Sequence, residues 1–262
     1  MKKTLIALAV AASAVVSGSA MAWSTTGTGS VELSGTIISG VTGNPWEIKV
    51  GTGAAHMDVI INKGESVAEL PVTLNIPVLG IRVADSTSKK FLGRPSIAPN
   101  IDYGTAVDLD SYTGTDGLAS LTLDMKDESG TNTIGVLKTK LYTGATAVYK
   151  GAGDLVAHRL HLYAANPKHA FFGGLPKAGD VISQDAYAVA NEAGTEYVAN
   201  FTDMGATDNI LAWTDFKDPI DYSGFYYAGI KARTPASVNL TSPAGDTQVK
   251  WKASLPVTVT FH

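Results

Sequence analysis

Residues 250–261 read KWKASLPVTVTF, with an apolar side chain at every second position from Trp251 to Phe261. A period of two sustained over this length predicts a β-strand with one buried face and one exposed face. Pro256 falls on the polar face, and because proline has no backbone N–H it predicts an edge position or a local break in the ladder. This stretch favours a β fold.

The rest of the chain has the same character. It contains 27 glycines, and its short alternating segments are separated by turn residues, which favours many strands over long helices. Further strands are expected at residues 46–50, 67–76, 118–125, 135–142, 225–231 and 236–240. The polar, glycine-containing link 127–131 predicts a hairpin between the third and fourth of these strands. Residues 152–216 differ, since Ala-rich segments such as 183–191 could form short helices, and we interpret them as an insertion on the β framework.

The N-terminus predicts export. Lys2 and Lys3 precede an apolar run over residues 5–16, and small residues follow up to Ala22. This pattern predicts a signal peptide over residues 1–22 that is cleaved after Ala22. The apolar run is too short to cross roughly 30 Å of hydrocarbon, and no later stretch is long and apolar enough to predict a spanning helix. We therefore expect a mature chain that starts at Trp23.

Composition excludes several classes of protein. The 24 acidic residues outnumber the 20 basic ones and no basic block occurs, so a nucleic-acid partner is not expected. The chain has no cysteine, which excludes disulfides and cysteine-ligated metal sites. An exported protein of this composition must be held together by packing and strand pairing.

A second alternating strand lies near the N-terminus. After the polar, Gly-rich residues 24–29, residues 30–38 read SVELSGTII. Val31, Leu33, Gly35 and Ile37 share one face of this strand. The pattern fits an ordinary first strand that pairs within its own domain, yet the segment is tethered at one end only by a flexible leader.

The chain resembles the major subunits of kappa-class chaperone-usher fimbriae, the FaeG-like fimbrillins. Besides the signal sequence, the resemblance is carried by six blocks in the expected order: SVELSGTI (30–37), WEIKVGTG (46–53), LDMK (123–126), GVLK (135–138), FFGGL (171–175) and residues 251–262. The order of these blocks over nearly the whole chain indicates the family more strongly than any single block.

The resemblance implies an all-β, immunoglobulin-like sandwich over residues 41–262 that lacks its final strand and so leaves a hydrophobic groove. A periplasmic chaperone fills the groove first. At an outer-membrane usher, the N-terminal extension of the next subunit, residues 23–40, then replaces the chaperone strand. In this mechanism Val31, Leu33 and Ile37 face the groove, and Gly35 fits where the groove is too shallow for a side chain.

The resemblance gives the C-terminal strand a second role. Chaperones of this system pair with the last strand of the subunit, so Val257, Val259 and Phe261 would form that contact. The same residues are compatible with an ordinary core strand. His262 departs from the family, whose members end in an aromatic or small polar residue.

The motifs of catalysis and metal binding do not occur in the chain. The sequence has no Gly-x-Ser-x-Gly elbow, phosphate loop or metal-binding helix motif, so neither enzymatic activity nor a cofactor is expected. The candidate metal ligands are His158, His161, His169, Asp108, Asp110 and Asp116. The histidines lack the i, i+4 spacing of a zinc-binding helix, and Ala119 occupies the place of the bidentate Glu in a calcium loop. We therefore expect no metal site.

Receptor binding is implied by the resemblance alone. Subunits of this family bind host glycoconjugates through the inserted region. Residue types that stack on or hydrogen-bond to sugars occur here at Tyr149, Lys150, Tyr163, Tyr187 and Trp213. Residues of these types more often fill the core or the surface, and no receptor-binding motif accompanies them here.

The sequence thus predicts a subunit that is exported through the periplasm, polymerises with copies of itself in a surface fimbrium and adheres to host glycans. One alternative is a minor or initiating subunit of the same fimbria, without receptor binding. Another is an outer-membrane β-barrel, which also fits a signal peptide and an amphipathic last strand. A barrel requires at least about eight strands of about ten residues with an apolar lipid face, and the sequence contains too few.

Overall fold

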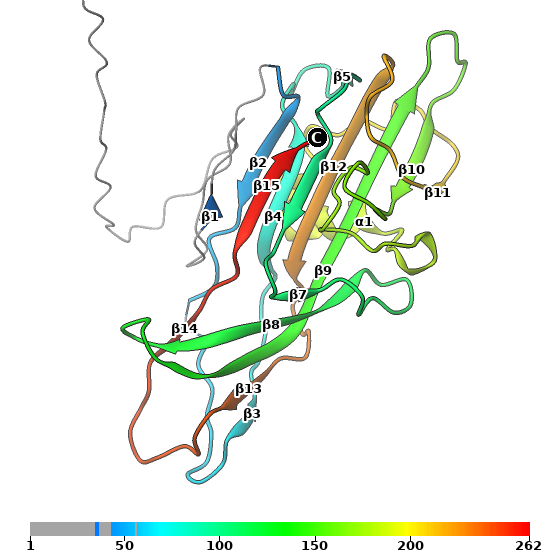
Figure 1. The fold of residues 1–262 in the computed structure, drawn as a ribbon. Helices are drawn as coiled ribbons and strands as arrows, with labels where there is room; N and C mark the ends of the chain where they lie inside the picture. The colour runs from blue at the N-terminus through cyan, green and yellow to red at the C-terminus, as the bar shows by residue number, and fades with distance from the viewer. Residues whose placement is uncertain (1–34, 37–42, 56) are drawn as a thin grey trace, which may run out of the picture.

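The computed structural model describes residues 35–36, 43–55 and 57–262, and Figure 1 labels its elements. The strands are β1 (Gly35–Thr36), β2 (Trp46–Val50), β3 (Val67–Glu69), β4 (Ile76–Val83), β5 (Phe91–Leu92), β6 (Pro99–Asp102), β7 (Val107–Asp108), β8 (Leu118–Asp127), β9 (Thr133–Lys150), β10 (His158–Leu162), β11 (Ile210–Ala212), β12 (Asp221–Ile230), β13 (Ser237–Leu240), β14 (Trp251–Ala253) and β15 (Val257–Phe261). The helical elements are η1 (Gly179–Val181), α1 (Ala186–Ala193) and η2 (Thr195–Tyr197). The predicted all-β class is confirmed.

The long strand β9 pairs with four other strands of the larger sheet. Its first half pairs antiparallel with β8 and β13, and its second half pairs antiparallel with β12 and β10. The sheet continues from β12 through β4 to β2, and from β10 to β11. The predicted hairpin is confirmed as β8–β9. Hydrogen bonds from Ser129 and Asn132 to the Asp127 carboxylate order its turn and hold the pKa of that carboxyl well below its usual value.

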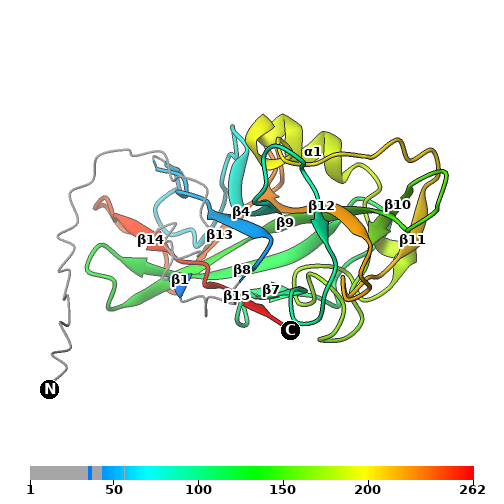
Figure 2. The same ribbon diagram turned by 90° about the horizontal axis from the view of Figure 1, so that it is seen from above.

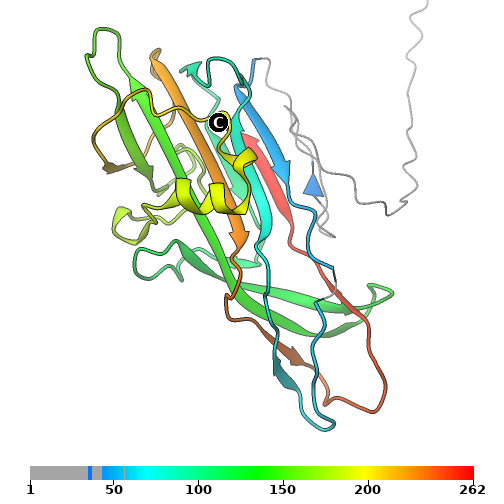
Figure 3. The same cartoon turned by 180° about the vertical axis from the view of Figure 1, so that it is seen from behind.

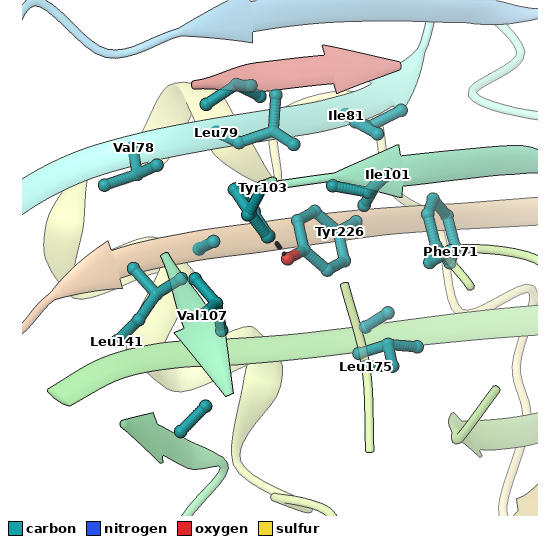
Figure 4. Close-up of a cluster of buried hydrophobic side chains, with 14 of the residues drawn as sticks. Val78, Leu79, Ile81, Ile101, Tyr103, Val107, Leu141, Phe171, Leu175 and Tyr226 are labelled. Carbon is teal, nitrogen blue, oxygen red and sulfur yellow. Dashed lines mark hydrogen bonds between the residues drawn. The ribbon is translucent and has the colours of Figure 1, made fainter. Parts of the chain in front are cut away.

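A smaller sheet, in the order β1-β15-β6, faces the larger one. Figure 4 shows the core between them, where Ile101 and Tyr103 meet Leu79, Ile81 and Tyr226 from the larger sheet. The Tyr103 and Tyr226 hydroxyls lie 2.9 Å apart, and burial raises the pKa of both phenols. Two sheets packed face to face on one core form an immunoglobulin-like sandwich.

The helix α1 covers the outer face of the larger sheet. It lies on the opposite side of that sheet from β15 (Figure 2) and crosses in front of β9 and β12 when the molecule is seen from behind (Figure 3). Because successive side chains of a strand point to opposite faces, Tyr226 of β12 enters the main core while Phe225 and Tyr227 pack beneath Ala186 and Ala190 of the helix. β12 is therefore buried on both faces, and its sequence shows no alternation.

Trp46 anchors one end of the sandwich. Its ring is fully buried, with centroids 4.9 Å from Phe91 and 5.2 Å from Phe216, and its Nε1 donates a 2.8 Å hydrogen bond to the Ile97 carbonyl. Phe216 and Phe171 both have positive φ, of 55° and 61°, which bulky residues rarely adopt. The aromatic packing of this cluster holds them in that conformation.

Several strands differ from the prediction: β9 and β12 are longer than predicted, most of β4 and all of β6 and β10 lie outside the predicted segments, and two predicted strands are divided. Residues 67–76 were expected to form one strand, but β3 pairs with β13 whereas β4 pairs with β12 and β2, and the chain bends between them at Leu74. The C-terminal stretch is divided in the same way, with β14 joined to β8 in the larger sheet and β15 joined to β6 in the smaller one. The break predicted at Pro256 is confirmed, and it marks the point where the chain changes sheets.

Gly173 is expected to be intolerant of a side chain. Its φ is +80°, and a Cβ there would lie 1.9 Å from the carbonyl oxygen of Ile101. We expect Gly173→Ala to lower the free energy of unfolding by more than about 2 kcal/mol, measured by thermal unfolding of the purified protein. Gly205→Ala is the matched control, because Gly205 has a φ of +79° and open space around it. Equal losses in the two variants would contradict the steric explanation.

Candidate functional site

The strand β15 has one buried face and two different edges. Val257 and Val259 are each 3 % exposed and belong to the main core, whereas Phe261 packs against it only partly buried. Along one edge β15 pairs antiparallel with β6. The terminal residue His262 extends this pairing through two backbone hydrogen bonds with Ala98, of 3.0 and 3.2 Å.

Among the described residues, the other edge of β15 pairs only with the short strand β1. β1 runs parallel to it for two residues, with Gly35 opposite Val257 and Thr36 opposite Thr258. No other described residue pairs with this edge. Outside the described residues lie the remaining residues of the predicted donor strand, Val31, Leu33 and Ile37.

Residues 57–61 form a second open edge. Met57, Val59 and Ile61 pack partly buried against the main core, while the intervening Ile60 is 92 % exposed. This alternation is typical of a strand, yet residues 57–61 make no backbone hydrogen bond to another described residue. The preceding strand β2 pairs only with β4 among the described strands.

These two edges border the same core. Val257 and Val259 of β15 belong to it, and Met57, Val59 and Ile61 pack against it. The edge of a strand presents unpaired N–H and C=O groups that can pair with a strand from another chain. The geometry is therefore suited to accept an added strand that would bury apolar side chains against the core.

The structure separates the candidate sugar-binding residues. Tyr149 lies partly buried at the end of β9, where its ring centroid is 5.1 Å from His158 and 6.3 Å from Tyr222. Lys150 follows it and stands opposite Asp221 of β12. These two residues lie at the end of β9 and do not meet the other three candidates.

Tyr163 and Trp213 meet around a histidine. The Trp213 ring stacks on His169 with centroids 4.1 Å apart and planes 6° from parallel, and Tyr163 approaches the same imidazole edge-on at 6.4 Å. Burial lowers the pKa of His169, and the nearby Asp215 carboxylate opposes that shift. The fifth candidate, Tyr187, lies apart from this cluster on α1.

The candidate metal ligands do not converge. His158 Nδ1 lies 2.6 Å from Asp208, whose pKa is lowered by this hydrogen bond, and His161 and His169 are hydrogen-bonded to different asparagines. Asp110 forms an ion pair with Lys177. Within the part of the chain that the structure describes, no group of three or more His, Cys, Asp or Glu side chains could hold a metal ion.

Comparison with known proteins decides the family. All of residues 1–262 match the family model described as "Fimbrial, major and minor subunit". The chain belongs to this family. K88 fimbrial protein AC from Escherichia coli is 31 % identical over 291 residues, and K88 fimbrial protein AD from the same organism is 30 % identical over 294 residues; each alignment covers all of both chains. The K88 minor fimbrial subunit FaeI of E. coli is 30 % identical over 127 residues, which cover 47 % of this chain and 48 % of FaeI.

Membership of the K88 fimbrial family confirms the predicted resemblance. The chain is a fimbrial subunit, which implies assembly with other fimbrial subunits and a location in the surface fimbrium. Both major and minor subunits belong to this family, so membership leaves the two roles open. Among the described residues, no helix is long and apolar enough to cross a membrane.

Proposed function

We propose that this K88-type fimbrial subunit polymerises by donor-strand exchange and that the resulting fimbria adheres to host-cell glycoconjugates. The N-terminal extension, residues 23–40, of one subunit adds as a strand between β15 and residues 57–61 of the next. The observation that carries this proposal is the pair of open strand edges over a shared core. Seven donor residues span about 23 Å, enough to cover the five residues of β15 and extend beyond it.

The energetics favour this mechanism. Val31, Leu33 and Ile37 contribute about 1.5–3 kcal/mol each when buried, before ordering costs. A typical domain is stable by only about 5–15 kcal/mol, so a subunit with an empty groove is marginal and prone to aggregate at its open edges. A periplasmic chaperone pairs with the strand of Val257, Val259 and Phe261 and so protects the subunit. At an outer-membrane usher, the N-terminal extension of the next subunit then replaces the chaperone.

The competing arrangement is an ordinary first strand that pairs with its own chain. The observed pairing of Gly35 with Val257 and of Thr36 with Thr258 lies within one chain. In donor-strand exchange the same segment would lie on this edge of β15 but would come from the neighbouring copy. The test must therefore distinguish a contact within one chain from a contact between chains.

Engineered cysteines make this distinction, because the chain has no cysteine of its own. We expect fimbriae that carry Thr36→Cys together with Thr258→Cys to give a ladder of covalent oligomers on a non-reducing gel, since donation links every subunit to the next. A second pair, Thr36→Cys with Thr260→Cys, would cross-link if the donated strand lies two residues further along β15. The single variants are the controls and cannot form a ladder. Disulfides that form only within a single monomer, or no ladder from either pair, would rule out donation between neighbours.

A minor or initiating role is the second candidate, and the similarity to FaeI favours it. Polymer-forming and initiating subunits share the fold but differ in copy number. Quantifying this chain against the other subunits in purified fimbriae separates the two, because a major subunit accounts for most of the protein mass.

A further inference from the structure

Gly43 marks the place where the N-terminal extension joins the sandwich. The structure describes the chain from Gly43 through β2, and residues 37–42 lie outside the described residues. Gly43 has a φ of +82°, and a Cβ there would lie 2.6 Å from a guanidinium nitrogen of Arg94. The left-handed backbone and the close approach of Arg94 both require glycine. The Arg94 side chain therefore lies directly over the base of the extension.

Arg94 follows β5, which is firmly held at this end of the molecule. β5 lies at the end of the sandwich where β2 begins, in both Figure 1 and Figure 3. The ring of Phe91 in β5 has its centroid 4.9 Å from that of Trp46 in β2. The backbone N–H of Arg94 donates a 2.8 Å hydrogen bond to the Phe216 carbonyl. The surface beside Gly43 is thus preorganised by the aromatic cluster beneath it.

Two side chains of this surface point outward. Successive side chains of a strand point to opposite faces, so Leu92 points away from the core that receives Phe91, and it is 62 % exposed. Arg94 is also exposed, and its guanidinium makes no hydrogen bond or ion pair with another described residue. An apolar side chain beside an unpaired guanidinium can contact a protein surface and pair with a carboxylate on it.

The length of the chain before Gly43 indicates what this surface meets. In the proposed mechanism Ile37 lies in the groove of the neighbouring subunit, while Gly43 stays in its own sandwich. Gly43 is six residues after Ile37, and six residues span at most about 22 Å. The surface around Gly43 must therefore lie close to the neighbour. A short tether also gives the two surfaces an effective concentration of the order of millimolar, so a small contact suffices.

We propose that Gly43, Leu92 and Arg94 form an exit patch that makes a second contact between successive subunits, outside the donated strand. This inference rests on the proposed strand exchange. The partner is the copy of this chain that accepts the extension. Leu92 packs on its surface and Arg94 pairs with one of its carboxylates, which are plentiful because the chain has 24 acidic residues against 20 basic ones. The exit patch fixes the angle between neighbours, which a tethered strand alone would leave free.

Photo-cross-linking of intact fimbriae tests this contact, because the chain has no cysteine of its own. Assembled Leu92→Cys fimbriae are labelled with a benzophenone maleimide and irradiated, and we expect a ladder of covalent oligomers. Leu155→Cys is the matched control, since Leu155 is 95 % exposed in the β9–β10 turn, and β12 and β4 separate β9 from β2. It should give severalfold less cross-linking. Equal ladders, or cross-links confined to one chain, would overturn the exit patch.

The stiffness of the fimbriae is a second measurement that does not depend on Leu92→Cys. Arg94→Glu should lower the persistence length of fimbriae in electron micrographs, because it turns an attraction between neighbours into a repulsion. Arg94→Lys keeps the charge and should retain most of the stiffness. An unchanged persistence length in Arg94→Glu would overturn the ion pair between subunits.

The outcomes separate this inference from the proposed function. A ladder from Thr36→Cys with Thr258→Cys, but none from labelled Leu92→Cys, would leave strand exchange standing and overturn the exit patch. A ladder from labelled Leu92→Cys, but none from either cysteine pair, would rule out strand exchange and leave the exit patch as a contact between subunits.

Discussion

Deletion of residues 24–38 is expected to abolish fimbrial polymerisation while the subunit still accumulates as a monomer bound to its chaperone. The deletion removes the strand that the neighbouring subunit would accept, but leaves β15 and residues 57–61 intact as the acceptor. Size-exclusion chromatography of periplasmic extracts measures the monomer, and electron microscopy of the cell surface measures the polymer. Fimbriae of normal number and length would contradict donor-strand exchange.

Two single substitutions sharpen the deletion experiment. Leu33→Asp places a charge on the apolar face of the donor strand, where burial of an unpaired carboxylate would cost several kcal/mol. Ser34→Asp introduces the same side chain one position along, on the polar face. We expect Leu33→Asp to prevent polymerisation and Ser34→Asp to permit it. Equal behaviour of the two variants would show that the segment does not bind as a strand with one buried face.

Trp46→Ala is expected to lower the free energy of unfolding by about 3–5 kcal/mol, a larger loss than that expected for Gly173→Ala. The indole is fully buried among Phe91, Phe171 and Phe216, so its removal leaves a cavity that these rings cannot close. It also leaves the buried Ile97 carbonyl without its donor. Equilibrium unfolding in urea, followed by circular dichroism, measures the change in the free energy of unfolding.

Two controls identify the cause of that loss. Trp46→Phe keeps an aromatic ring but removes Nε1, so it should lose less, about 1–3 kcal/mol. Trp213→Ala removes the same side chain from a partly exposed position and should cost about 1 kcal/mol. If Trp213→Ala were as damaging as Trp46→Ala, the aromatic cluster around Trp46 would not be the main anchor of the sandwich.

Much of the framework could be predicted from local patterns. The residues of β2 and the pairing of β8 with β9 follow from alternation and from turn residues, which act over short distances in the chain. The helix α1 begins within the Ala-rich segment 183–191 and ends two residues after it. The residues that face the core from β15 were also predicted correctly, because Val257 and Val259 alternate with threonines.

The candidate site was predictable only in part. The alternating pattern identified β15 and the N-terminal segment, but nothing in residues 57–61 indicated an unpaired edge, since Ile60 interrupts the alternation with an exposed apolar side chain.

The sequence alone therefore determined the β class, the strands at residues 46–50 and 118–125, the buried face of β15 and the place where Pro256 interrupts the last strand. The strands β6 and β10 and most of β4 lie outside the predicted segments. Only the tertiary structure decided that β14 and β15 belong to different sheets and that β12 is covered on both faces, by the smaller sheet and by α1. The reason is physical. A period of two reports the burial of side chains along one strand, whereas the choice of partner strand depends on backbone pairing between segments far apart in the chain.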